Sequence, residues 1–370
     1  MIISKLVNKY LMSKRIISKL NPVKLDYSVL LDKSVNLNKE IVASFGKNGN
    51  GIIIIDKIPN YLAYKNKLLP LAKKIHLMPP EIKKKYERPD TNYVPGICTF
   101  ERFHYQGVKD MATSWYATAL EDVHEPVKFI ENGKEKIFNF PDNFWPTEEL
   151  PELEQAFKNL SRLGYEVQTK IYPHLEKLVK SLAPTYELGR IDKFTSFPFG
   201  RLIHYHTSVE FAFHNKDESV YLHNDTSTLT ALCSPIYMDE NNNVVPDLTD
   251  EEGHGLEILK SDGQLYSLTI PPTCMAIQLG EIMQIISGGT LEPTPHRVVA
   301  TKYPTYTREQ FALFMEPKFD TRIGVPEGFT EADVYSVRPG GDRVLDLKET
   351  WKNNITFREL LGNSYEQFVK

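Results

Sequence analysis

The sequence contains little cysteine and no long apolar run. Its 370 residues include three cysteines, Cys98, Cys233 and Cys274, and no two of them have the close spacing of a zinc-binding or redox pair. So few cysteines argue against a disulfide framework and favour a reducing compartment. No stretch approaches about eighteen consecutive apolar residues, the length that a membrane-spanning helix requires, so we expect no transmembrane segment.

The chain also lacks an excess of basic residues, an internal repeat and a low-complexity tract. Its net charge is −4 at pH 7, with positive and negative residues mixed along the chain. A protein that binds nucleic acid usually presents a basic face, so we expect no nucleic-acid partner. With 41% hydrophobic residues the chain can bury a large core, which is typical of a sizeable globular enzyme.

The first twenty residues differ from the rest because they are basic and amphipathic, and no acidic residue occurs before Asp26. This pattern is typical of a mitochondrial presequence or of a helix on a membrane surface. The alternative is a loosely docked terminal tail, and Met12 is an alternative start. We expect a cytoplasmic protein, with the mitochondrion as the alternative if the segment is a presequence.

Two histidines and an aspartate have the pattern of a metal site. His223 and Asp225 are two positions apart, so on a strand they point to the same side. His296 follows a proline-rich segment and precedes Val298-Val299, as a residue at the start of a strand does. Two imidazoles and one carboxylate suit non-haem iron(II) and leave positions free for oxygen and a chelating acid. The chain has ten histidines, however, and a lone histidine is more often hydrogen-bonded or on the surface.

A candidate anion-binding residue follows the second histidine. Arg308 precedes the apolar run from Phe311 to Met315, which we expect to be a strand. A guanidinium there would hold a carboxylate through two parallel charge-assisted hydrogen bonds, a role that lysine fills less well. A surface ion pair is the alternative. Upstream, His204, His206 and His214 are candidates for the pocket wall, with a purely structural role as the alternative, and we expect Glu281 to be a turn residue.

From about Phe199 to Pro317 the chain resembles the iron(II)/2-oxoglutarate-dependent dioxygenases of the isopenicillin N synthase-like family. The segments that carry the resemblance occur in the family's order: Arg201 to Tyr205, His223 to Thr226, Gly255 to Ile258, Ile277 to Glu281, His296 to Val298, and Arg308 to Pro317. The resemblance implies an α+β protein with a mainly β core. That core would be a distorted double-stranded β-helix, or jelly roll, with an N-terminal helical and β extension and a long support helix.

The resemblance also implies a reaction. Fe(2+) would be held by His223, Asp225 and His296, with no catalytic residue beyond these ligands, and O2 and 2-oxoglutarate would be co-substrates. Arg308 would bind 2-oxoglutarate with help from Tyr205, and Gln310, which stands where the family usually has serine, would donate its amide. The enzyme would couple decarboxylation of 2-oxoglutarate to succinate with hydroxylation or desaturation of a small organic substrate. Because related halogenases leave the carboxylate position empty, Asp225 argues against halogenation.

Two alternatives remain at this point: an iron oxidase of the same fold that does not use 2-oxoglutarate, which Gln310 keeps open, and a non-enzymatic metal-binding barrel. We infer no protein partner. Fold alone does not supply the substrate.

The organisation that we expect has five parts. They are a basic amphipathic tail (1–24), an N-terminal dioxygenase-like region (25–145), the support helix (146–190), the jelly-roll core (191–320) and a C-terminal helical extension (321–370). In the support helix, apolar residues recur at helical spacing from Leu153 to Leu182, and Pro173 should interrupt or kink it. The acidic, Asn-rich stretch 237–254 is predicted to be a solvated hairpin extension.

Overall fold

A computed structural model describes most of the chain. The described ranges are 17–91, 93–99, 104–105, 108–109, 111–131, 134–182, 191–206, 218–246, 248–250, 255–299, 305–336 and 344–368. The first sixteen residues, which include most of the basic amphipathic segment, and His214 lie outside these ranges. Within them, no helix combines the length and the apolar character needed to cross a membrane.

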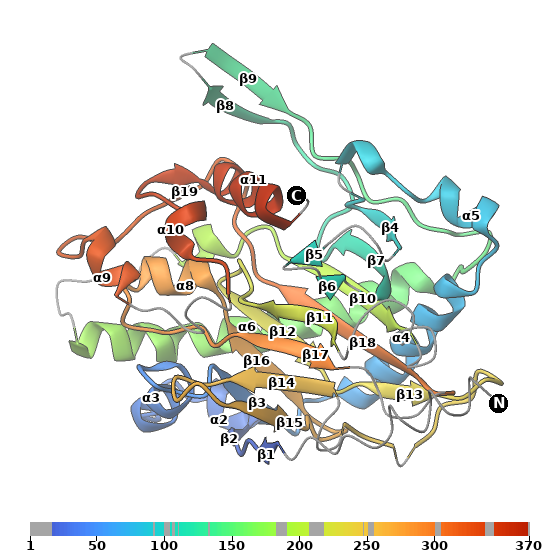
Figure 1. Cartoon of the computed structure of the whole chain (residues 1–370), viewed down its shortest axis with the longest axis horizontal. Coiled ribbons are helices and arrows are strands. Elements are labelled where there is room, and N and C mark those ends of the chain that lie inside the picture. Colours follow the sequence, from blue (N-terminus) through green and yellow to red (C-terminus); the bar gives the residue numbers. More distant parts are fainter. Residues whose placement is uncertain are drawn as a thin grey trace.

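Two large sheets dominate the structure (Figure 1). The larger has the spatial order β2 (Val23–Asp26), β3 (Ile52–Asp56), β16 (Met275–Leu279), β12 (Leu229–Cys233), β18 (Thr307–Phe314), β10 (Phe199–Tyr205), β7 (Ala112–Thr118) and β4 (Gly96–Cys98), and β13 (Ile236–Met238) also pairs with β18. The smaller has the order β1 (Ser18–Lys19), β15 (Leu265–Leu268), β14 (Gly255–Leu259), β17 (His296–Val299) and β11 (Glu218–His223).

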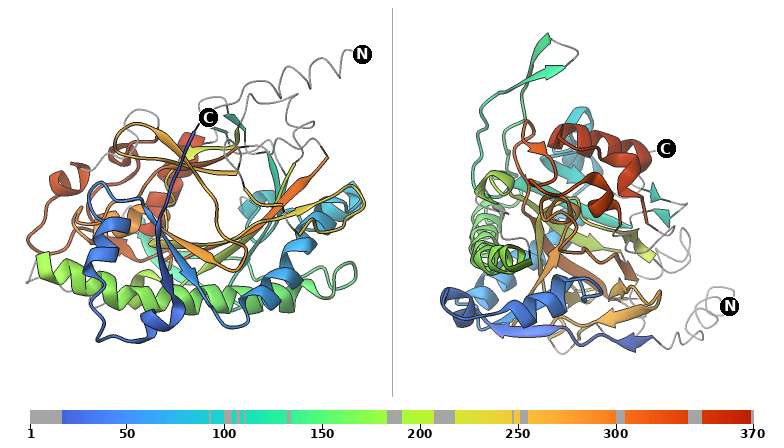
Figure 2. Two further views of the ribbon diagram at one scale, coloured as in Figure 1. Left: turned by 90° about the horizontal axis from the view of Figure 1, so that it is seen from below. Right: turned by 90° about the vertical axis from the view of Figure 1, so that its left-hand side faces the viewer.

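Three two-stranded sheets complete the described β structure: β5 (His104–Tyr105) with β6 (Val108–Lys109), β8 (Val127–Glu131) with β9 (Lys134–Phe138), and β19 (Arg322–Ile323) with β20 (Ile355–Thr356). The β8–β9 hairpin projects away from the body of the protein (Figures 1 and 2). The described helices are α2 (Tyr27–Leu31), α3 (Asn38–Phe45), α4 (Tyr61–His76), α5 (Pro80–Lys85), α6 (Leu153–Leu182), α8 (Glu281–Ile286), α9 (Glu331–Tyr335), α10 (Leu347–Thr350) and α11 (Phe357–Phe368).

The two sheets pack face to face through alternate strand residues. On β10, Ile203 and Tyr205 belong to a buried cluster that also contains Ile258 of β14 and Val298 of β17, whereas Leu202 points the other way into a second cluster. This alternation is what a period of two produces on a strand covered on both faces. The space between the sheets is therefore an apolar interior with walls from both.

Helices cover the outer face of the larger sheet. The 30-residue helix α6 runs along it, and the right-hand view of Figure 2 shows α6 end-on beside α3 and α4. Its buried side chains recur every three or four residues, and Gly164 lets the helix approach closely, since a Cβ there would lie 3.0 Å from Leu313 Cδ2. Pro173 does not interrupt α6. Burial of one whole face outweighs the single backbone hydrogen bond that proline removes.

The chain is thus a mixed α/β protein with several sheets, and the described strands form no closed barrel. Near the start of the chain, helix α3 leads into the buried strand β3, which lies inside the larger sheet. Part of the segment expected to be a tail belongs to the sheets. Strand β1 pairs in parallel with β15 of the smaller sheet, and β2 pairs in parallel with β3 of the larger.

Candidate metal centre

Strand pairing brings the two predicted histidine ligands together. Strands β11 and β17 are antiparallel neighbours, and His223 at the end of β11 lies opposite His296 at the start of β17. Asp225 follows two residues later, with its Oδ1 3.6 Å from His223 Nε2 and 3.7 Å from His296 Nε2. One potential ligand atom from each residue lies within 4.8 Å of the other two. These separations allow all three groups to bind one ion between them.

The hydrogen bonding of His223 and the protonation states of His296 and Asp225 suit a cation. His223 Nδ1 donates to the backbone carbonyl of Tyr221 at 2.8 Å, which leaves the lone pair of Nε2 directed at Asp225. Burial, together with the neighbouring His223, lowers the pKa of His296 to about 4, so its imidazole is neutral at pH 7. Burial alone would raise the pKa of Asp225, but His296 and His223 outweigh it and lower that pKa to about 2. His296 thus offers a neutral imidazole and Asp225 a carboxylate, beside the Nε2 of His223.

One oxygen of this carboxylate is left without a partner. Asp225 Oδ2 is buried and accepts no hydrogen bond from the described residues. A buried charged oxygen with no partner is costly, and a metal ion between the ligands would satisfy it. The backbone is fixed here, because Glu281 N donates to Asp225 O at 2.8 Å. The donor set and this unpartnered oxygen both fit iron(II).

The prediction that Glu281 is a turn residue was wrong. Glu281 is the first residue of α8, and its side chain is buried. Burial raises its pKa to about 8, and the charge of Asp225 adds to this. The carboxyl is therefore mostly neutral at pH 7. The turn prediction failed because Gly280 marks the end of β16, while the residues after it are apolar and continue as a buried helix.

A cavity of about 500 Å³ opens beside His223 and Asp225. Aromatic side chains form much of its wall, among them Tyr116, Phe140, Phe199, Tyr221, Phe314 and Phe319. Ionisable groups line it too, among them Arg201, Arg358 and Glu316. Such a mixture of apolar wall and a few polar groups is typical of a pocket for a small organic molecule.

None of these three residues was identified from the sequence as a candidate site residue. Arg201 donates from Nε to Ser114 Oγ at 3.0 Å, and its guanidinium stacks on the ring of Tyr116. Glu316 follows β18, and burial, with the charge of Asp225, raises its pKa to about 8. The signal for Arg201 was available, because it lies four residues before Tyr205 on one strand and so shares its face.

Arg308 is buried inside the protein and makes a complete ion pair with the chain itself. Its Nε donates to Asp250 Oδ1 at 2.9 Å and its Nη2 to Asp250 Oδ2 at 2.8 Å. Its Nη1 donates to Gln310 Oε1 at 2.7 Å, while Gln310 Nε2 donates to Cys233 O at 3.0 Å. Tyr205 lies alongside, with its ring centre 5.1 Å from the guanidinium carbon. As arranged, this edge of Arg308 does not fit a second carboxylate, and the amide of Gln310 is directed at the backbone.

Known proteins resemble this chain more in structure than in sequence. No family model matches the sequence. A flavonol synthase/flavanone 3-hydroxylase of Petunia hybrida is 29% identical over 87 residues, which is 23% of this chain and 24% of that protein. The matched stretch therefore spans about a quarter of that relative.

Solved structures match over nearly the whole chain. One is a 2OG-Fe(II) oxygenase family protein of Caulobacter crescentus, with a TM-score of 0.65, 20% identity, and coverage of 94% of this chain and 99% of that one. Another is a full-length Neurospora crassa protein in complex with alpha-KG, with a TM-score of 0.64, 18% identity, and coverage of 96% and 98%. A third is the Arabidopsis thaliana dioxygenase for auxin oxidation with 2-oxoglutarate, with a TM-score of 0.52, 19% identity, and coverage of 86% and 100%.

The chain has the fold of the iron(II)/2-oxoglutarate oxygenases. The resemblance noted in the sequence is therefore confirmed at the level of the fold. Within this oxygenase fold, the three predicted metal ligands meet at one point beside the cavity, which His223 and Asp225 line, whereas Arg308, Tyr205 and Gln310 form a separate buried group.

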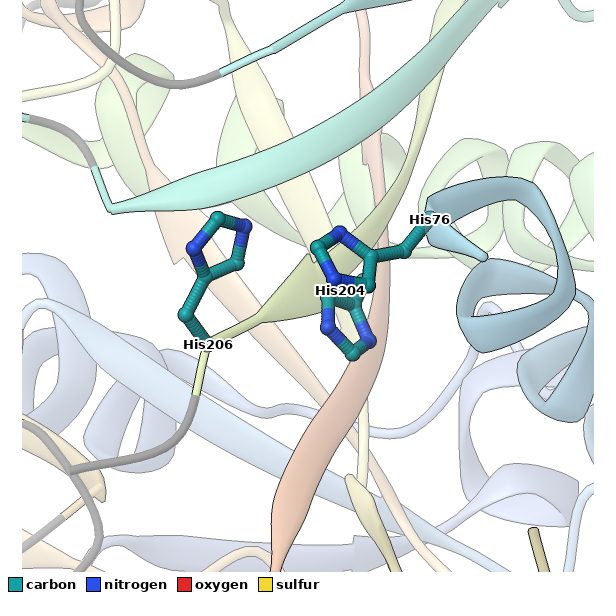
Figure 3. A group of neighbouring side chains, drawn as sticks. All are labelled: His76, His204 and His206. Atoms are coloured by element: carbon teal, nitrogen blue, oxygen red, sulfur yellow. The ribbon is translucent and has the colours of Figure 1, made fainter. Parts of the chain in front are cut away.

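A second histidine cluster lies on the other face of the larger sheet (Figure 3). His204 and His206, from the end of β10, meet His76 at the end of α4, and both Oε atoms of Glu309 lie within 3.1 Å of His204 Nδ1. The rings of His76 and His204 are stacked, with centres 4.1 Å apart and planes at 17°. An ion lies in the plane of each imidazole that binds it, so two stacked rings cannot share one ion as arranged. We assign His204 and His206 a structural role in the oxygenase fold.

Gly255 at the start of β14 provides a test of how Asp250 is accommodated. Its φ is +81°, and a Cβ there would lie 2.3 Å from Asp250 Cγ. We expect Gly255→Ala to lower the free energy of unfolding by about 1–3 kcal/mol from backbone strain, with a further loss from the clash. Gly328→Ala is the matched control, because its φ is +86° and nothing lies within 4 Å of its Cβ. Urea unfolding of both variants would measure the difference, and equal losses would contradict the close packing of Asp250.

Proposed function

We propose that the chain is a non-haem iron(II) oxygenase that couples decarboxylation of 2-oxoglutarate to succinate with hydroxylation or desaturation of a small organic molecule. The observation that carries the proposal is the convergence of His223, Asp225 and His296 on one point beside an aromatic cavity, where Asp225 Oδ2 has no hydrogen-bond partner among the described residues. The fold supports it, since the matching structures are described as 2OG-Fe(II) oxygenases or contain alpha-KG.

In this proposal the three residues hold iron(II), which when bound supplies the centre where oxygen and a 2-oxo acid are activated. Asp225 neutralises one positive charge of the ion, and the bond from His223 Nδ1 to the Tyr221 carbonyl fixes the ring that binds it. The aromatic wall excludes water and positions the substrate. Because the carboxylate position is filled by Asp225, we favour hydroxylation or desaturation over halogenation.

The finer organisation is part of the same proposal. We propose that the facing sheets form a distorted jelly roll with its core in residues 191–320, flanked by 25–145, the support helix in 146–190 and a C-terminal extension in 321–370. Leu361 and Tyr365 of α11 line the cavity, which supports a role for that extension in the site.

We further propose a cytoplasmic protein that acts on a small molecule without a nucleic-acid or protein partner. All three cysteines are buried thiols, which supports a reducing compartment. The mitochondrial alternative depends on the basic N-terminal tail (1–24), of which residues 1–16 lie outside the described ranges.

One observation favours a second candidate. Because Asp250 and Gln310 already bind Arg308, an iron oxidase of the same fold that does not use 2-oxoglutarate is the alternative function.

Succinate release separates these functions. We expect protein loaded with iron(II) to convert added 2-oxoglutarate to succinate in the presence of oxygen, slowly without substrate and faster with one. Protein without iron should show only background release. Failure of the iron-loaded protein to form succinate with any of a panel of small aromatic molecules, together with oxygen consumption that does not depend on 2-oxoglutarate, would favour the alternative oxidase.

A further inference from the structure

Arg308 forms a carboxylate-binding site whose occupant is part of the same chain. Its Nε and Nη2 bind the two oxygens of Asp250 in parallel, at 2.9 and 2.8 Å, which is the arrangement by which arginine binds a free carboxylate. Its Nη1 donates to Gln310 Oε1. The Nε and Nη2 edge of Arg308 is therefore occupied, and Asp250 already balances the charge of the guanidinium, so a second carboxylate cannot bind that edge.

The structure around Asp250 is built to hold it there. Its side chain is buried, and Tyr237 donates a short hydrogen bond from its hydroxyl to Asp250 Oδ1. Thr269 Oγ1 donates to the backbone oxygen of Asp250 at 2.7 Å. Gly255 supplies the room, because any other residue would place its Cβ against the carboxylate. The pairing is thus supported from three separate strands or their ends.

The position of Arg308 explains why this pairing concerns the co-substrate. Arg308, Gln310, Ala312 and Phe314 alternate along β18 and so share one face. Ala312 and Phe314 pack into the cluster between the sheets, and Phe314 also lines the metal cavity. Arg308 therefore faces the same interior as the cavity, farther along the strand. Arg308, Gln310 and Tyr205 are not among the described residues that line the cavity.

We propose that Asp250 is an internal ligand of the co-substrate site and sets its specificity: the distal carboxylate of a 2-oxo dicarboxylate can bind Arg308 only by displacing Asp250. This rests on the proposed function for the identity of the co-substrate. Two carboxylates on one buried guanidinium leave a net negative charge away from water, which is strongly unfavourable. The parent protein thus gains little affinity from a distal carboxylate.

Paired 2-oxo acids test this directly. 2-Oxoglutarate and 2-oxopentanoate have the same chain length and the same chelating head, and only the first has a distal carboxylate. We would measure their dissociation constants by anaerobic calorimetry on iron(II)-loaded protein. In the parent we expect the two constants to agree within about threefold. In Asp250→Ala we expect 2-oxoglutarate to bind at least about tenfold more tightly than 2-oxopentanoate, and Arg308→Ala in that background should remove the difference.

Two controls sharpen this comparison. Asp262→Ala removes an exposed acid at a turn, and it should leave the ratio of the two constants unchanged. A parent protein that already prefers 2-oxoglutarate by more than about tenfold, or a folded Asp250→Ala variant with an unchanged ratio, would overturn the proposal.

A second measurement covers the case in which Asp250→Ala folds poorly, because the substitution leaves Arg308 unpaired. Formate is small enough to enter the space left by the side chain, so it should raise the melting temperature of Asp250→Ala in a saturable way. It should not do so for the parent or for the double variant with Arg308→Ala. No effect of formate on Asp250→Ala would overturn the proposal. Rescue by formate without binding of either 2-oxo acid to any variant would support Asp250 as the occupant of Arg308 and contradict the proposed function instead.

Discussion

His296→Ala is expected to abolish iron(II) binding at micromolar concentrations and, with it, succinate formation. The substitution removes one of three protein ligands. Loss of a residue that only orients a ligand usually lowers metal affinity about 10- to 100-fold, and loss of a ligand itself should lower it far more. The fold should survive, because the interior is built by other side chains such as Ile258 and Val298. Anaerobic titration with iron(II) would measure the affinity.

A buried histidine outside the site provides the control for this variant. His174 lies on α6 with its ring packed inside the protein, and it belongs to neither histidine cluster. His174→Ala should bind iron(II) like the parent. Equal loss of iron in both variants would indicate general unfolding, and retention of parent affinity by His296→Ala would show that the ligand set is wrong.

Arg308→Ala is expected to cost about 3–5 kcal/mol of unfolding free energy, more than Gly255→Ala loses from backbone strain. Burial by itself would lower the pKa of Arg308, but the charge of Asp250 outweighs it and raises that pKa, so the guanidinium stays charged. Removal of the arginine leaves Asp250 as a buried, uncompensated charge. Denaturant unfolding would give the loss.

A double variant separates the ion pair from simple loss of volume. Asp250→Asn added to Arg308→Ala removes the unpaired charge and should recover at least about 1 kcal/mol. Purely additive losses from the two substitutions would contradict an interaction between these residues.

The metal ligands could be predicted from sequence because strand geometry relates His223 to Asp225 and the order of motifs along the chain identifies His296. His223 and Asp225 are two residues apart on an extended segment, so their common direction follows from strand geometry. The approach of His296 depends on the pairing of β11 with β17 across 73 residues (296 − 223), which spacing cannot give. The local pattern around His296 predicted only the start of a strand, and the order of motifs along the chain indicated that this strand carries the partner of His223.

The segment 237–254 shows what the sequence could not resolve. The turn around Asp239 to Asn243 is exposed, as predicted for a solvated hairpin. Tyr237 and Asp250, however, are buried against Arg308, and residues 251–254 lie outside the described ranges. The composition of the segment shows that it is acidic, but it does not show which acid forms a buried ion pair. The partner of Asp250 is Arg308, which is 58 residues away in the sequence. The prediction of a wholly solvated extension was therefore wrong at Tyr237 and Asp250.

The most direct test of the central claim is an anaerobic titration of iron(II)-loaded protein with 2-oxoglutarate, followed by visible absorption. Chelation of iron(II) by a 2-oxo acid produces a visible charge-transfer band that neither component has alone. We predict that this band appears with one iron per chain in the parent and is absent in His296→Ala at the same protein and iron concentrations. A parent that binds iron(II) but develops no band, or a His296→Ala variant that develops the same band, would contradict the assignment of His223, Asp225 and His296 as the centre of a 2-oxo-acid-dependent oxygenase.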